Sequence, residues 1–193
     1  MTHIYFVRHA QPEHNWEEDR SRSLTEEGQR DSMRVNEILK DTILDYAISS
    51  PYLRSRETIR ECVENHGLNL ETDERLRERT KGHKGNNLDM FRKRWSDLEY
   101  YEEGGESLGM VQRRNMETIK ELLHTHQNKS IIIGTHGTAL STILHNFDPT
   151  FNCDSFLLII DYTPYIIRLD FEGSECVGKE ELLIIEKEFK KML

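Results

Sequence analysis

Cysteine is scarce in this chain of 193 residues, and its few cysteines do not cluster. Cys62, Cys153 and Cys176 are odd in number and lie far apart in the sequence. This spacing matches neither a disulfide framework nor a zinc site. We therefore expect a protein of the reducing cytoplasm, where thiols stay unpaired.

Long apolar segments are also missing. The run at residues 156–160 is among the longest, and it is far shorter than the roughly 20 residues that cross a bilayer. The first residues show neither the basic region nor the hydrophobic region of a signal peptide. The sequence thus predicts a protein that neither enters nor anchors to a membrane.

An excess of positive charge is absent as well. The chain has 26 Lys and Arg against 35 Asp and Glu, which gives a formal net charge of -9. Non-specific binding of nucleic acid depends on neutralising phosphates, so we expect no nucleic-acid partner. Any site for an anion must be a local basic pocket that acts against the overall field of the protein.

Apolar runs and amphipathic segments alternate along most of the chain, without repeats, linkers or low-complexity sequence. This alternation, at this length, predicts one α/β domain over residues 1–193: a three-layer α/β/α sandwich around a mostly parallel sheet. Thr25 has the features of a helix N-cap. The predicted strands cover residues 4–7, 44–49, 68–72, 130–134, 156–161, 165–171 and 182–185. The predicted helices cover about 25–40, 51–66, 88–98, 106–126, 139–145 and a last charged segment to Leu193.

Two of the predicted strands end in the same way. The strand at 4–7 runs directly into Arg8 and His9, and the strand at 130–134 leads to His136. The carboxyl ends of parallel strands share one edge of a sheet, and ligands of open α/β sheets bind there. Histidine can act as a nucleophile or a base, and arginine suits an anion.

A third strand end adds further positive charge. Residues 49–51 lead straight into a helix that carries Arg54 and Arg56, and a helix N-terminus is itself an anion site. Two histidines, at least two arginines and this helix terminus therefore converge on one sheet edge. The sequence predicts a pocket for a phosphate group.

Six segments, in order, resemble motifs of the histidine phosphatase superfamily, also called the phosphoglycerate mutase-like family. The likeness as a whole covers nearly the whole chain, from residue 4 to about residue 165. The resemblance implies a phosphoglycerate mutase-like fold. The segments are 7–10 (the Arg-His-Gly motif, with Ala10 in place of glycine), 24–28 (Leu-Thr-x-x-Gly), 49–58 (Ser-Ser-Pro to Thr), 76–82 (the segment of the acid), 105–107 with Arg113 (Gly-Glu-Ser and its downstream arginine), and 135–137 (the second His-Gly).

The resemblance also implies a mechanism without a metal or a cofactor, in which His9 attacks phosphorus and becomes a phosphohistidine. Arginine and histidine side chains would supply the positive field around the phosphoryl group, which is the main requirement of phosphoryl transfer. Glu78 would protonate the leaving oxygen and then activate water. The implied charge-stabilising residues are Arg8, Arg54 and His136, and the implied substrate-binding residues are Asn15, Gln11, Gly137 and Thr138.

Some features depart from the family pattern. Gln11 and Pro12 replace the common Glu-Thr, and the stretch after Glu78 lacks the frequent Gly-x-Trp-Glu-Gly, so Glu106 and Glu13 stay open as alternative acids. The long insertion of cofactor-dependent mutases is absent. Residues 75–94 form a basic stretch in an acidic chain: a solvated face is the ordinary interpretation, and a second anion subsite is the alternative.

These observations favour a metal-independent phosphatase that hydrolyses the phosphomonoester of a small metabolite. Three alternatives remain open: a phosphomutase, a protein phosphatase, and a non-catalytic regulator that binds a phosphorylated ligand. Specificity is expected in the loop at 11–23 and in a cap region at about 80–106, because fold alone does not determine function.

Overall fold

The computed structural model describes residues 1–188 and contains one six-stranded sheet. The strands are β1 (Thr2–Arg8), β2 (Tyr46–Ser49), β3 (Leu70–Thr72), β4 (Ser130–Thr135), β5 (Tyr162–Glu172) and β6 (Glu175–Glu186). The helices are α1 (Glu26–Leu39), α2 (Leu53–Asn65), α3 (Leu88–Ser96), α4 (Leu108–Thr125), α5 (Gly137–Phe147) and α6 (Cys153–Ile159). Short 3-10 helices lie at Asp19–Ser21 and Glu74–Leu76.

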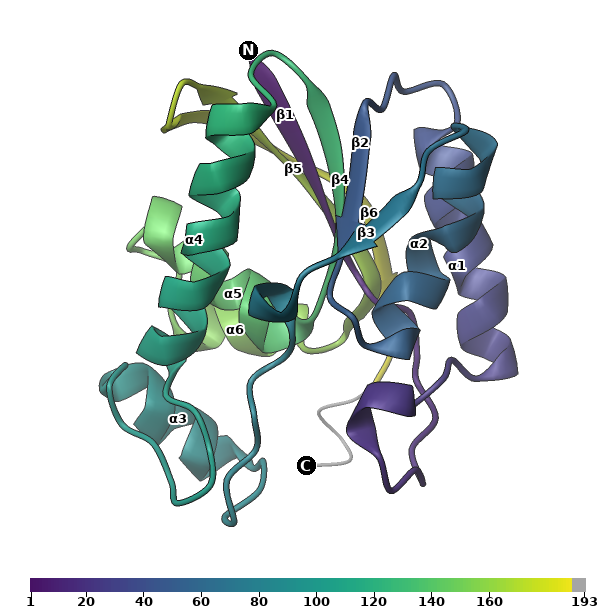
Figure 1. The fold of residues 1–193 in the computed structure, drawn as a ribbon. Helices are drawn as coiled ribbons and strands as arrows, with labels where there is room; N and C mark the ends of the chain where they lie inside the picture. The colour runs from purple at the N-terminus through teal and green to yellow at the C-terminus, as the bar shows by residue number, and fades with distance from the viewer. Residues whose placement is uncertain (189–193) are drawn as a thin grey trace.

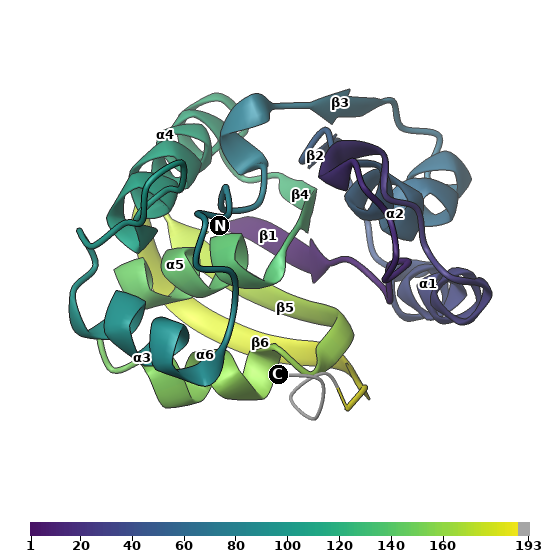
Figure 2. The same cartoon turned by 90° about the horizontal axis from the view of Figure 1, so that it is seen from below.

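The sheet has the order β3-β2-β4-β1-β5-β6. The first four strands in this order are parallel, and β5 and β6 continue the sheet as an antiparallel pair. Helices α1 and α2 cover one face, and α4, α5 and α6 lie on the other (Figures 1 and 2). The three-layer sandwich with a mostly parallel sheet is therefore confirmed.

Strand β1 explains why the sheet is covered on both sides. Its side chains point alternately to the two faces, so Ile4 and Phe6 join the core formed with α4 and α5, whereas Tyr5 and Val7 join the core formed with α1 and α2. A strand that is buried on both faces reads as a continuous apolar run, as this one does.

The strand register brings the predicted strand ends together. Arg8 pairs with Thr135 across β1 and β4, and Ser49 pairs with Gly134 across β2 and β4. The ladder continues one step further on each side, because the His9 N–H donates to the Thr135 carbonyl at 3.1 Å and the Ser50 N–H donates to the Gly134 carbonyl at 2.9 Å. His9 and Ser50 thus leave the sheet at the same edge.

The predicted strand at 156–161 is wrong, because this segment belongs to helix α6. Asn152 begins the helix with a capping box that includes Ser155, and the apolar run then buries Phe156 and Ile159 while Leu158 is exposed. A short apolar run fits a buried strand and a helix turn equally well, and the cap decides between them.

The C-terminal hairpin consists of β5 and β6 instead, joined at Gly173, whose positive φ suits the turn. Strand β6 begins well before the predicted residue 182. Of the predicted C-terminal helix, Lys187 and Glu188 are not helical, and the rest lies outside the described residues. Within residues 1–188, no helix is long and apolar enough to cross a membrane.

The predicted cap region at 80–106 contains α3 and two loops beyond the sheet edge (Figure 1). A buried ion pair between Arg94 and Glu102 joins α3 to the loop that follows it. Arg94 also donates to the Gly85 carbonyl at 2.6 Å and to Asn86 Oδ1 at 3.0 Å. These contacts tie both loops of the cap to one buried guanidinium.

Candidate active site

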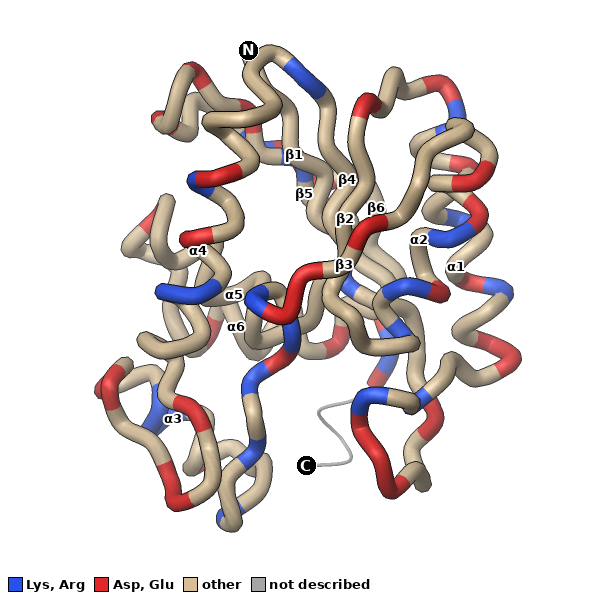
Figure 3. The backbone as a smooth tube through the Cα atoms, viewed as in Figure 1, with Lys and Arg blue, Asp and Glu red and all other residues tan. Residues whose placement is uncertain are grey.

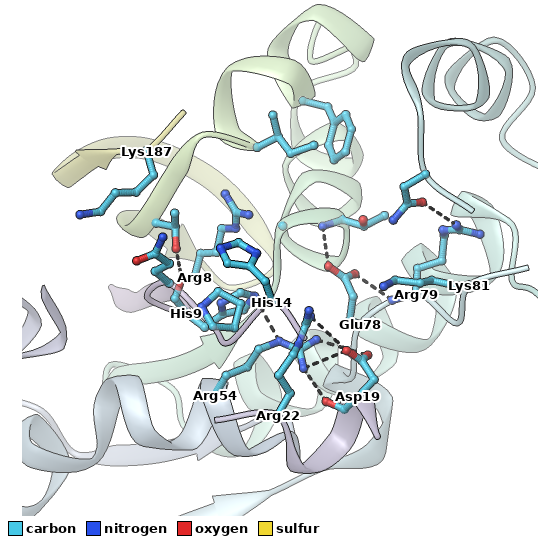
Figure 4. A pocket seen from close by; sticks show the side chains of 18 of the residues that line it. Arg8, His9, His14, Asp19, Arg22, Arg54, Glu78, Arg79, Lys81 and Lys187 are labelled. Atoms are coloured by element: carbon cyan, nitrogen blue, oxygen red, sulfur yellow. Dashed lines mark hydrogen bonds and ion pairs between the residues drawn. The ribbon is translucent and has the colours of Figure 1, made fainter. Parts of the chain in front are cut away.

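A cavity of about 410 Å³ lies at the carboxyl ends of the parallel strands (Figure 4). Arg8, His9, Arg54 and Glu78 all line it. Most other lining residues come from the loop at 11–23, the cap, α6 and the start of α5. The structure therefore brings together the predicted nucleophile, two predicted arginines and the predicted acid.

His9 is buried with its two ring nitrogens in different surroundings. Nδ1 lies 2.8 Å from the Ala10 carbonyl, and because a carbonyl only accepts, Nδ1 carries the hydrogen. Burial, followed by the charges of Arg54 and Arg8, holds the pKa of His9 well below its usual value. The imidazole is then neutral, and Nε2 keeps its lone pair.

The loop that carries His9 is fixed from two sides. The Ala10 N–H donates to Thr58 Oγ1 at 2.9 Å, and the Thr163 hydroxyl donates to the His9 carbonyl at 2.9 Å. Ala10, which replaces the usual glycine, is fully buried. The imidazole is therefore attached to a backbone held by both α2 and β5.

Arg8 and Arg54 provide the positive field beside His9. Arg54 is 1% exposed, and its Nε lies 3.4 Å from His9 Nε2. Arg8 donates to the carbonyls of Ile159 and Tyr162, and its buried Nε has no hydrogen-bond partner among residues 1–188. Burial lowers the pKa of Arg8 to about 10, against the opposing charge of Glu78, so it stays charged at neutral pH.

The loop at 11–23 supplies cavity residues that the sequence did not predict, among them the charged pair Asp19 and Arg22. Arg54 donates to the Asp19 carbonyl at 2.7 Å and pairs with its carboxylate at 3.3 Å, and Arg22 pairs with the same carboxylate at 3.0 Å (Figure 4). The only sequence signal was a group of charged residues just before the Leu-Thr motif. Asp19 thus bridges the two arginines across the floor of the cavity.

His136 and Asn15 differ from their predicted places. His136 is fully buried and contacts the His9 ring edge to face, with centroids 5.2 Å apart, but it does not line the cavity. Its Nε2 lies 2.7 Å from the Ser50 hydroxyl oxygen. Asn15 is exposed and is not part of the cavity wall, where His14 lies instead.

Gln11, Gly137 and Thr138 all line the cavity. The Gln11 side-chain oxygen accepts from the Thr25 hydroxyl at 3.1 Å, and Thr25 caps α1 as predicted. A Cβ at Gly28 would lie 2.2 Å from the Gln11 carbonyl oxygen, so the glycine lets this loop approach α1 closely. The Leu-Thr-x-x-Gly segment therefore positions the cavity wall at Gln11.

The Glu78 carboxylate occupies the N-terminus of α5. It accepts from the backbone N–H groups of Thr138 at 3.0 Å, Ala139 at 3.1 Å and Arg79 at 2.8 Å. The first turn of a helix favours a negative charge, so this terminus fixes the position of the carboxylate. The Thr138 N–H, predicted to bind substrate, donates to Glu78 in this structure.

The segment before Glu78 is held by Arg114, which the motifs in the sequence did not single out. Arg114 donates to the carbonyls of Arg75, Arg77 and Glu78 and makes a two-bond pair with Glu106. One position along α4 turns a side chain by about 100°, which directs Arg113 outward to Glu99. Arg113, which the resemblance to the Gly-Glu-Ser segment singles out, therefore lies away from the segment before Glu78.

The two alternative acids do not reach the cavity. Glu106 is bound by Arg77, Arg114 and the Thr80 N–H, and although its burial acts to raise its pKa, these partners hold the pKa below the usual value. Neither Glu106 nor Glu13 lines the cavity. The geometry favours Glu78.

Much of the basic stretch between residues 75 and 94 is paired with acids. In Figure 3, blue and red segments alternate along the chain that leads from β3 toward α3. Of the basic residues in this stretch, Arg79 and Lys81 line the cavity. The ion pairs are Arg75 with Asp73 and Glu121, Arg77 with Glu106, and Arg79 and Arg94 with Glu102.

The buried histidines predict how stability depends on pH. Burial, with nearby arginines, holds the pKa values of His9 and His136 well below 6.5 in the folded protein. Below pH 6.5 the unfolded chain binds protons that the folded protein does not, so stability falls as pH falls. The contribution of each histidine to this slope should grow as pH falls and approach about 1.4 kcal/mol per pH unit well below pH 6.5.

Urea unfolding between pH 7 and pH 5.5 measures this slope. We expect His9→Gln and His136→Gln each to flatten it, by an amount that approaches one proton at the acid end of this range, whatever their effect on stability at pH 7. Equal slopes in all three proteins would show that these histidines bind protons alike in the folded and unfolded states.

Comparison with known proteins places the chain in context. The model of the histidine phosphatase superfamily (branch 1) matches residues 4–179. The probable phosphoglycerate mutase GpmB of Erwinia tasmaniensis is 26% identical over 160 residues, which cover 75% of this chain and 74% of that protein. Within residues 1–188, no three His, Cys, Asp or Glu side chains form a group that could hold a metal ion.

Two solved structures share the fold. Phosphoserine phosphatase from Entamoeba histolytica, in complex with 3-phosphoglyceric acid, has a TM-score of 0.77 at 18% identity, over 98% of this chain and 100% of its own. A mycobacterial glucosyl-3-phosphoglycerate phosphatase has a TM-score of 0.69 at 17% identity, over 93% and 96%. These likenesses confirm the predicted phosphoglycerate mutase-like fold.

Proposed function

This chain belongs to the histidine phosphatase superfamily (branch 1), and from that membership we propose that it hydrolyses a phosphomonoester of a small metabolite through a phosphohistidine at His9. The two solved structures described above, by their names, are phosphatases of small phosphorylated molecules. Their low identity makes them a likeness of fold, so the proposal depends on the site itself.

One observation carries the proposal: a buried, neutral His9 whose unprotonated Nε2 lies 3.4 Å from Arg54 Nε, in a cavity that Arg8 and Glu78 also line. The Ala10 carbonyl fixes the tautomer. A neutral imidazole is a competent nucleophile, whereas a protonated one is not. A protein that only binds phosphate has no use for the carboxylate of Glu78 at this place.

In the first step, His9 Nε2 attacks phosphorus while the bond from phosphorus to the ester oxygen breaks. Glu78 in its acid form gives its proton to the leaving oxygen, which departs as an alcohol. Arg8 and Arg54 stabilise the charge on the phosphoryl oxygens, and Arg54 exchanges its contact with Asp19 for the phosphate. Such preorganised charge is a large part of phosphoryl-transfer catalysis.

In the second step, water attacks the phosphohistidine. The Glu78 carboxylate takes a proton from this water as the new oxygen–phosphorus bond forms and the bond to Nε2 breaks. Neutral His9, protonated Glu78 and free phosphate result, so the cycle closes. The positive field comes from arginines throughout, and we therefore propose that no metal takes part.

A phosphomutase is the second candidate, because the Erwinia relative is named a probable phosphoglycerate mutase. The same phosphohistidine would return its phosphate to a substrate hydroxyl instead of to water. Mutase activity that depends on a bisphosphorylated primer, and exceeds the release of phosphate, would favour this candidate.

Trapping the intermediate tests the proposal. The protein is mixed with p-nitrophenyl phosphate in excess EDTA, quenched in alkali to preserve phosphohistidine, and digested for mass spectrometry. We expect turnover that survives EDTA and a phosphoryl group on the peptide that contains His9. Turnover abolished by EDTA, or a label on another residue, would refute the mechanism.

A further inference from the structure

We infer that the substrate carries a single phosphate on an apolar organic group, which packs against a wall of the same cavity. This inference concerns what the cavity binds. It rests on the proposed function only in that the bound molecule is called a substrate. The wall consists of Phe91, Phe156 and Ile160, all of which line the cavity.

The wall is a built part of the fold. Phe91 comes from α3 in the cap, and Phe156 and Ile160 come from α6 and its end, so two distant segments meet there. The Phe91 and Phe156 rings meet edge to face with centroids 5.0 Å apart. Trp95 packs against the Phe156 ring with centroids 5.8 Å apart, and Phe151 packs against Trp95 one layer further from the cavity.

The charges around the cavity also favour a substrate with a single anionic group. Of the cations around its rim, Arg22 is paired with Asp19, Arg79 lies 3.7 Å from Glu102 and donates to the Glu106 carbonyl, and Lys187 contacts Glu27 at 2.5 Å and Asp31 at 2.8 Å. A second anionic group on the substrate would have to compete with these acids.

One cation of the rim lacks such an acid. Lys81 is exposed, and no ion pair is recorded for it among residues 1–188. An exposed lysine contributes little to binding because water and salt screen its charge. The phosphate therefore has Arg8 and Arg54, while the rest of the molecule meets an apolar surface.

Binding of n-alkylphosphonates tests the inference without requiring catalysis, because their carbon–phosphorus bond is not hydrolysed by this chemistry. Titration calorimetry compares ethyl-, butyl- and hexylphosphonate with 3-phosphonopropionate, which adds a carboxylate. We expect affinity to rise about two- to four-fold for each added methylene, as expected for burial of apolar surface. 3-Phosphonopropionate should bind no better than ethylphosphonate.

Two variants test whether the apolar wall causes the dependence of affinity on alkyl chain length. Phe91→Ala should remove about half of the chain-length dependence and leave ethylphosphonate binding within two-fold of wild type, by analogy with the loss of apolar contact area. Phe151→Ala is the matched control, because it weakens the same cluster from behind without lining this cavity. Its chain-length dependence should equal that of wild type.

Two results would overturn the inference. One is affinity that does not change, or falls, from ethyl- to hexylphosphonate. The other is a preference for 3-phosphonopropionate that Lys81→Ala removes, which would establish the second anion subsite instead. Turnover of p-nitrophenyl phosphate is measured in parallel, so failure of the proposed phosphatase activity is seen separately from failure of apolar binding.

Discussion

Replacing His9 with alanine should lower the turnover of p-nitrophenyl phosphate by at least about 10³-fold, the scale seen when a covalent nucleophile is removed. His136 cannot take its place, because it does not line the cavity. Arg8 and Arg54 remain in the variant, so inorganic phosphate should still bind. Calorimetry with phosphate therefore separates loss of chemistry from loss of the site.

His14→Ala is the matched control for this variant. His14 lines the same cavity but is exposed, and the proposed mechanism gives it no role. We expect its turnover to stay within about three-fold of wild type, as for most surface substitutions. If His9→Ala kept its activity and His14→Ala lost it, the nucleophile would be assigned to the wrong histidine.

The sequence predicted the centre of this site because its residues adjoin regular elements. Arg8 and His9 follow directly from β1, His136 follows β4, and Arg54 lies in the first turn of α2. Parallel strands in register place such residues at one edge of the sheet, independently of the conformation of the loops. The prediction needed only the strand ends, which buried apolar runs mark clearly.

The periphery of the site could not be predicted because it depends on contacts between distant segments. Asp19 meets Arg54 across 35 positions, and Arg114 reaches the Arg75 carbonyl across 39. No local pattern encodes such pairs. Arg114 and not Arg113 reaches this carbonyl because of the direction in which α4 faces, and that direction is set by packing.

The apolar wall could not be predicted from the sequence either, because one of its elements was assigned wrongly. The run that contains Phe156 was predicted as a strand, and its short length allowed that interpretation. As a helix it presents Phe156 toward α3, where Phe91 completes the wall. A misassigned element therefore concealed the feature that we propose selects the substrate. Arg75, Arg77, Arg79 and Arg94 of the basic stretch form ion pairs with acids of the protein itself.

Glu78→Gln should separate the two steps of the proposed reaction. The amide keeps one oxygen for the backbone N–H groups at the start of α5, but it can neither give nor take a proton. Loss of a general acid–base group lowers rates by about 10²- to 10⁴-fold, and we expect this loss in steady-state turnover. For alkyl phosphates both steps need the carboxyl group, so no phosphohistidine should accumulate.

p-Nitrophenyl phosphate should behave differently, because p-nitrophenolate leaves without a proton. The first step then survives in Glu78→Gln while hydrolysis of the phosphohistidine stays slow. Rapid mixing should show a burst of about one equivalent of p-nitrophenolate per enzyme, followed by slow turnover, as expected when a covalent intermediate accumulates. The phosphoryl group should be found on His9 after the burst.

Glu13→Gln is the control, since Glu13 was an alternative acid and does not line the cavity. It should show wild-type turnover and no burst. A burst in Glu13→Gln, or wild-type turnover in Glu78→Gln, would show that a group other than Glu78 gives and takes the proton. Slow turnover without a burst would mean that the first step itself is slow in Glu78→Gln. Glu78 would then act by holding the start of α5 beside Arg8, and not by moving a proton.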